Sequence, residues 1–196
     1  MKNLNELAHK IHESNKLRGF DVAQDNIGQS LMLIVGEISE AMDAHQCGRF
    51  ADMKEYDSEI AYLAENFPRA NIEGGFRLSP FEKYIKNTFE EELADIVMRT
   101  LDFCAAFGVD IEKLCYENET IICCNNIGEY LLVVTGQVYS AYWEIECKEE
   151  NCYAKLESVI TAIEHKAKEI DINLEKHIAL KMRYNETRPY KHGKRY

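Results

Sequence analysis

The chain has 196 residues, of which 46% are hydrophobic and 29% are charged, as in an ordinary globular protein. Its net charge of −11 argues against a protein that binds the nucleic-acid backbone. There is no signal peptide and no long apolar run, so we expect a soluble, cytoplasmic protein with no membrane partner. The cysteines are irregularly spaced without a CxxC, which favours reduced thiols, and the adjacent Cys123 and Cys124 are interpreted as core residues.

Apolar periodicity predicts helices along the whole chain, and no stretch alternates as a strand would. The fold class is therefore expected to be all-α. Capping residues and glycines set the expected bounds, with Asp25 or Asn26 starting the second helix and Pro68 to Pro80 forming a loop. The expected helices cover residues 3–18, 26–47, 53–66, 81–107, 110–123, 127–148, 152–169 and 172–187.

The second expected helix presents two carboxylates on one face. Glu37 and Glu40 are three residues apart, so their side chains point toward the same neighbour. Because the run LMLIV is apolar nearly all round, we expect a buried helix with Leu33 beside the acids at a desolvated rim. A solvated acidic face is the alternative. The core stripe of this helix is expected to be Ile27, Leu31, Ile34, Ile38 and Met42.

A second acidic pair, Glu92 and Asp95, lies on the helix expected over residues 81–107. Its core stripe is Phe89, Leu93, Ile96, Val97, Thr100 and Cys104. If the two helices converge, their four carboxylates repel by several kcal/mol unless cations lie between them. Oxygen ligands favour a hard ion, and Mg²⁺ is the usual one where phosphates share the coordination. The two pairs therefore predict a magnesium site.

The chain also contains an internal repeat. Residues 26–44 match residues 126–144 without a gap, and six of these nineteen positions are identical. A fainter match relates ELADIVMRTL to KLESVITAI, which begins at Lys155. We predict one all-α domain over residues 1–196 that is built from two tandem repeats and forms an intramolecular pseudo-dimer. Repeat 1 covers residues 1–114 with an insertion at about 49–86, and repeat 2 covers 115–196.

The two repeats differ where chemistry is expected. None of the four acids recurs in the second copy, where the corresponding residues are Gln137, Ser140, Lys155 and Ser158. Instead, the end of the second copy is basic: residues 181–196 contain six lysines and arginines against the single acid Glu186. One half is therefore expected to carry the metal site and the other a cationic arm.

Three blocks of the sequence resemble the MazG-like all-α NTP pyrophosphohydrolases. They are residues 12–48 with GEISEAMDA, residues 87–114 with FEEELADIVMRTLDF, and residues 181–196 with KMRYNETRPYKHGKRY. The blocks stand in the family's order, while the middle of the chain matches poorly.

The resemblance implies an enzyme of nucleotide metabolism that hydrolyses a (d)NTP to the (d)NMP and pyrophosphate, with Mg²⁺ as cofactor. By position, the metal ligands and catalytic acids would be Glu37, Glu40, Glu92 and Asp95. The residues at the substrate triphosphate would be Lys181, Asn185 and Arg188. Glu37 is our choice for the carboxylate that orients the attacking water. Because family sites form between two subunits, the repeat looks like a fused dimer with one site retained. Such units are expected to be able to pair as a homodimer.

Other residues near these motifs have two interpretations each. Arg99 could pair with Asp95, which we prefer, or touch a phosphate. Glu91 is interpreted as solvated, although it is a possible fifth carboxylate. Asn15 and Phe20 could border the base or simply pack.

Two other functions would also place acids on helices. A di-metal oxidase requires two ExxH motifs, and only Glu6-x-x-His9 fits. The stronger alternative is a non-catalytic helical module that binds nucleotide or metal for regulation. The base and sugar preference is not encoded in any recognisable pattern.

Overall fold

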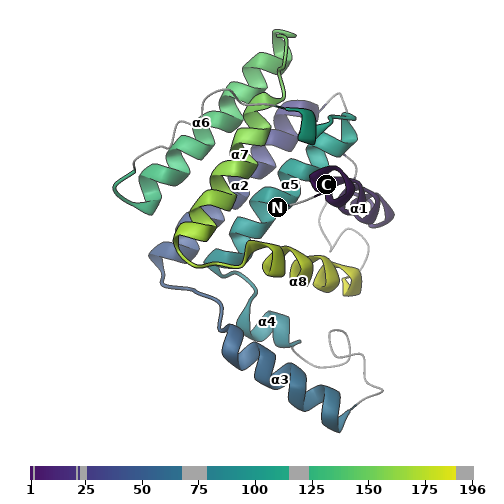
Figure 1. Cartoon of the computed structure of the whole chain (residues 1–196), viewed down its shortest axis with the longest axis vertical. Helices are drawn as coiled ribbons and strands as arrows, with labels where there is room; N and C mark the ends of the chain where they lie inside the picture. The colour runs from purple at the N-terminus through teal and green to yellow at the C-terminus, as the bar shows by residue number, and fades with distance from the viewer. Residues whose placement is uncertain (2, 21, 23–25, 68–78, 115–123, 189–196) are drawn as a thin grey trace.

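The structure is a computed structural model that describes residues 1, 3–20, 22, 26–67, 79–114 and 124–188. Within these ranges every regular element is a helix, which confirms the all-α fold class (Figure 1). None of the helices described is long and apolar enough to span a membrane. The predicted loop over 68–78, the alternative cap Asp25, Cys123 and the basic residues Lys191, Lys194 and Arg195 lie outside the described residues.

The α-helices are α1 (Leu4–Leu17), α2 (Ile27–Gln46), α3 (Met53–Asn66), α4 (Pro80–Tyr84), α5 (Phe89–Ala106), α6 (Ile127–Glu146), α7 (Ala154–Glu169) and α8 (Leu174–Thr187). Six of them lie close to the predicted bounds. Asn26 stands at the N-cap of α2, and Gly48 follows its C-cap with a φ of 67°. The sequence predicts an α-helix over 110–123. Of these residues the structure describes 110–114, which contain a 3₁₀ turn at Ile111–Lys113 and no α-helix.

The single helix predicted over residues 81–107 is wrong, because the chain breaks between Tyr84 and Phe89 to give α4 and α5. Asn87 has a φ of 60°, in the left-handed region, and Thr88 is extended. The amide of Asn87 donates to the Glu91 carboxylate at 2.8 Å. Local sequence here is compatible with helix, and the break is stabilised by this contact and by the packing of α4.

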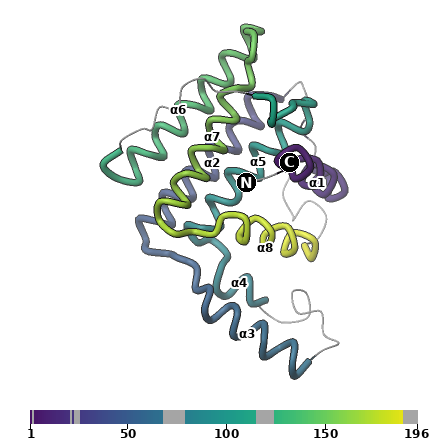
Figure 2. The backbone as a smooth tube through the Cα atoms, in the orientation of Figure 1, coloured from purple at the N-terminus to yellow at the C-terminus, as the bar shows by residue number. Residues whose placement is uncertain are grey.

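The main core contains buried residues of α1, α2, α5, α6, α7 and α8. Helix α2 packs against α5 and α6, and α7 packs against α5 and α6. Helices α1 and α8 pack on α5, which therefore lies at the centre of the molecule (Figure 2). Cys124 packs against this core as a partly buried residue, as expected. The predicted α5 stripe is entirely buried: Phe89, Leu93, Ile96, Val97, Thr100 and Cys104.

The prediction for α2 is only partly correct. Leu31, Ile34 and Ile38 are buried, but Met42 is 36% exposed and Met32 is 61% exposed. Helix α2 is thus not enclosed all round, because its neighbours α5 and α6 cover only part of its surface.

Helix α8 is held across α5 by a second, smaller cluster. Phe81 of α4 stacks on Tyr184 of α8 with ring centroids 4.4 Å apart. The Tyr184 hydroxyl donates to Glu82 at 2.8 Å, and Lys176 pairs with Asp57 of α3 at 2.9 Å. Figure 1 shows α3 and α4 at one end of the molecule, next to α8. Part of the insertion therefore serves to position α8.

Candidate functional site

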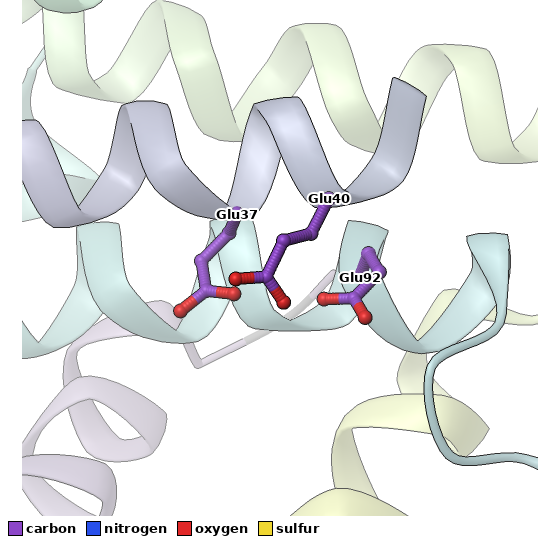
Figure 3. A group of neighbouring side chains, drawn as sticks. All are labelled: Glu37, Glu40 and Glu92. Carbon is purple, nitrogen blue, oxygen red and sulfur yellow. The ribbon is translucent and has the colours of Figure 1, made fainter. Parts of the chain in front are cut away.

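Carboxylates of α2 and α5 converge where the two helices pack. Glu37 and Glu40 project from α2 toward Glu92 of α5, as Figure 3 shows. Each of the three offers an oxygen atom within 4.8 Å of the others. We call these residues the α2–α5 group. Glu37 and Glu92 are buried, whereas Glu40 is exposed, so only part of the expected rim is desolvated.

A second set of acids lies within the first two turns of α5 and shares Glu92 with the first set. Glu91, Glu92 and Asp95 also offer oxygen atoms within 4.8 Å of one another, and we call them the α5 group. Glu92 belongs to both groups. The interpretation of Glu91 as solvated is wrong, because Glu91 is only 2% exposed. The break before α5 explains this, since the amide of Asn87 donates to Glu91.

Two cations already contact these acids. The Lys181 ammonium of α8 is paired with both Glu91 and Asp95. Arg99 donates from Nε to Glu37 Oε1 at 2.6 Å. The preferred pairing of Arg99 with Asp95 is therefore corrected: α2 and α5 lie side by side, and Glu37 is the carboxylate that reaches the guanidinium. Five carboxylates face two cations, which leaves an excess of negative charge.

This excess raises the pKa of the buried acids. Burial, followed by the negative charges of Glu91 and Asp95, raises the pKa of Glu92 to about 9. Burial and the nearby Asp95 raise the pKa values of Glu37 and Glu91 as well. Burial disfavours the charged form of Lys181, but Asp95 and Glu91 outweigh it and raise the pKa of the ammonium. Lys181 therefore stays charged, and the acids need a further cation or protons.

All seven predicted site residues line one cavity of about 340 Å³, between α1, α2, α5 and α8. They are Glu37, Glu40, Glu92, Asp95, Lys181, Asn185 and Arg188. Asn15, Phe20, Leu33 and Met98 line it too and add an amide and apolar surface. A cavity of this size is within the usual range for small-molecule sites.

Asp102, a buried residue of α5, attaches α1 at the side of the cavity that α1 forms. It accepts hydrogen bonds from the Asn15 amide at 2.8 Å and contacts His12 Nδ1 at 2.7 Å. This double contact fixes the end of α1, and with it Asn15, against α5. His12 belongs to the block that resembles the MazG-like family.

The α8 side of the cavity is the cationic side. The Arg188 guanidinium lies over the Tyr184 ring, 5.7 Å from its centroid. The Asn185 Oδ1 atom is buried and has no hydrogen-bond partner among the described residues. An unpaired amide oxygen in a cavity wall is a hydrogen-bond acceptor, so it is suited to a ligand group that donates an N–H or O–H. Sequence patterns did not single out Tyr184 or Lys86, which also lines the cavity.

Among the described residues after 124 there is no comparable set of acids. Lys155, which corresponds to Glu92, lies 4.0 Å from Glu144. Ser158, which corresponds to Asp95, donates to the Ala154 carbonyl at 3.2 Å. Among the described residues, the groups close enough to share a metal consist of carboxylates from α2 and α5. Glu6 and His9, the one ExxH pair that a di-metal oxidase could use, are not members of these groups.

The donor set fits Mg²⁺, because it consists only of carboxylate oxygens and carries excess negative charge. The cationic groups on the opposite wall, Lys181 and Arg188, fit an anionic ligand. The chain matches no protein-family model, no curated protein and no solved structure.

Proposed function

We propose that the protein is a Mg²⁺-dependent nucleoside triphosphate pyrophosphohydrolase that converts a (d)NTP to the (d)NMP and pyrophosphate. The observation that carries this proposal is the cavity in which acids of α2 and α5 face Lys181, Asn185 and Arg188 of α8. The acidic wall can hold a hard cation. The α8 wall can hold phosphates, whose negative charge the same cation would neutralise.

With substrate bound, the acids of the α2–α5 group, together with Asp95, would hold Mg²⁺. When bound, Mg²⁺ neutralises charge on the phosphates and lowers the pKa of a water molecule. The water oxygen forms a bond to the α-phosphorus while the bond from that phosphorus to its bridging oxygen breaks. Pyrophosphate leaves with the bridging oxygen, and a carboxylate takes the proton of the water.

Glu37 remains our choice for that carboxylate. Arg99 donates to its Oε1 atom, which fixes the side chain, and an oxygen of Glu37 lies within 4.8 Å of oxygens of Glu40 and Glu92. A carboxylate of raised pKa is a better proton acceptor, and burial raises the pKa of Glu37. Arg188 would bind the leaving phosphates, and Asn185 would donate to them from its Nδ2 atom. The apolar surface of Phe20 and Leu33 would border the nucleoside.

We also propose that the chain is a fused pseudo-dimer of the MazG-like type. Helices α2 and α6 both have 20 residues and begin 100 positions apart. Their ends match: Gly48 and Lys148 both have positive φ, at 67° and 55°. Helices α5 and α7 end alike, with positive φ at Gly108 and Asp171. These matches support duplication, with α2–α5 and α6–α7 as equivalent pairs.

A direct assay tests the activity. The protein is incubated with each dNTP and Mg²⁺, and pyrophosphate and phosphate are quantified separately. Glu40→Gln and Asp95→Asn should each lower pyrophosphate release by more than about 100-fold, since even groups that only support metal ligands are worth 10- to 100-fold.

Glu65→Gln provides the matched control, because Glu65 is an exposed acid on α3, away from the cavity. It should retain full activity, and circular dichroism should show unchanged helicity in all three variants. Normal turnover by both site variants would refute the proposed site. Nucleotide binding without pyrophosphate release would instead support the regulatory module.

A further inference from the structure

The two acidic groups of the site differ in how they are neutralised. In the α5 group, two of the three acids, Glu91 and Asp95, are paired with the Lys181 ammonium. In the α2–α5 group, Arg99 pairs with Glu37 through one oxygen. Over the described residues, no lysine or arginine pairs with Glu40 or Glu92. The α2–α5 group is therefore open to an added cation, while the α5 group already contains one.

Lys181 and a divalent ion would compete for the same oxygen atoms. The ammonium donates its N–H groups to the carboxylates and is only 8% exposed as a residue. Mg²⁺ needs direct, short contacts to the same lone pairs. An ion at Glu91 and Asp95 would also stand against a fixed positive charge. A second ion can therefore enter the α5 group only after Lys181 has moved.

The cavity offers Lys181 an alternative position. Its side chain is a flexible stem with a compact charge, and Asn185 and Arg188 lie one and two turns further along the same helix wall. A polyphosphate bound at those residues would present several negative oxygens to the ammonium. The lysine side chain would then exchange carboxylates for phosphates within the same cavity.

We propose that Lys181 neutralises the α5 group and keeps a divalent ion out of it until substrate binds. The free protein binds one divalent ion, at Glu37, Glu40 and Glu92, and a second ion enters at Glu91, Glu92 and Asp95 once a nucleotide polyphosphate draws Lys181 away. This inference rests on the proposed function and adds an order of binding to it. It makes complete metal loading depend on the presence of substrate.

Mn²⁺ serves as the probe, because the electron paramagnetic resonance signal of the free aqueous ion is lost on binding. Without nucleotide, the natural protein should bind one Mn²⁺ per chain. Lys181→Met removes the resident charge and should bind two, whereas Lys181→Arg keeps a charge and should bind one. Circular dichroism and urea unfolding establish that each variant is folded.

A second measurement needs no variant. Magnetic coupling between two nearby Mn²⁺ ions should be absent from the free natural protein and should appear on addition of a non-hydrolysable α,β-imido dNTP. Two ions in the free protein, one ion in folded Lys181→Met, or no coupling with the analogue would each overturn the inference. If pyrophosphate release is nevertheless normal, the proposed function stands. Absence of both Mn²⁺ binding and product refutes both proposals.

Discussion

Glu92 is the carboxylate shared by the two acidic groups, and it shows how a single residue is tuned by its neighbours. It is 3% exposed and lies near four other acids. Its pKa rises from an ordinary 4.5 to about 9 through burial first and then through Glu91, Asp95, Glu37 and Glu40. In the metal-free protein at neutral pH, Glu92 therefore carries a proton where a cation would otherwise be required.

This shift predicts how stability depends on pH. Between pH 4.5 and about 9 the folded state binds a proton that the unfolded state has released. Without metal, the free energy of unfolding should therefore fall as the pH rises through this window. Glu92→Gln removes the proton-binding group, so at about pH 8 the variant should be more stable than the natural protein by roughly 1–3 kcal/mol. Urea unfolding in EDTA at about pH 5 and about pH 8 measures how the free energy of unfolding depends on pH, for the natural protein and for Glu92→Gln.

Glu65→Gln is again the control and should leave the pH slope unchanged, because Glu65 is exposed. Adding Mg²⁺ should reverse the order of stability at about pH 8, since the metal binds the natural carboxylates and stabilises the folded state by mass action. Parallel pH slopes for the natural protein and Glu92→Gln would contradict the assignment of this proton to Glu92.

At the scale of elements, the site depends on how α1 and α8 are attached to α5. Helix α8 is attached by ion pairs to Glu91 and Asp95 and by the stacking of Tyr184 on Phe81. Helix α1 is attached near the cavity by Asp102, which contacts His12 and Asn15. Because Asp102 is buried, both partners depend on it for a hydrogen-bond acceptor.

Asp102→Ala should therefore lower the free energy of unfolding by about 2–4 kcal/mol, since it leaves two partly buried donors unpaired. Urea unfolding monitored by circular dichroism provides the measurement. Asp110→Ala is the matched control at the other end of α1. Asp110 also accepts from an asparagine of α1, Asn5, but its side chain is 41% exposed. Its loss should lower the free energy of unfolding clearly less than the loss of Asp102, and equal effects of the two variants would contradict the role given to Asp102.

At the scale of the whole molecule, the helices before residue 114 and those after residue 124 share one core. Helix α2 packs on α6, and α5 packs on α7 and α8. Core residues such as Ile34 and Val97 are completely buried. Separating these two parts of the chain would expose their shared surfaces to water, at about 25 cal/mol per Å² of apolar area.

Polypeptides of residues 1–114 and 115–196 should therefore each be largely unfolded when produced alone. Mixing them should restore helicity, as the shared core re-forms. Circular dichroism of the separate and mixed pieces, followed by thermal melting, tests this. A cooperative melting transition in either isolated piece would show instead that the repeats are independent domains.

The sequence alone determined the helices and the faces they present, because both depend on neighbours a few residues apart. It identified Glu37 with Glu40, and Glu92 with Asp95, by their helical spacing. The break at Asn87 was missed, although its signal is local: Thr88 is the N-cap of α5, and the Asn87 amide donates to Glu91 only four residues on.

Only the tertiary structure decided which charges meet. Arg99 pairs with Glu37, 62 residues away, and Lys181 contacts Glu91, 90 residues away. The cavity between α1, α2, α5 and α8 likewise exists only after packing. Spacing along a helix fixes the direction of a side chain, but its partner is whatever the neighbouring helix brings to it, and that depends on the packing of the whole chain.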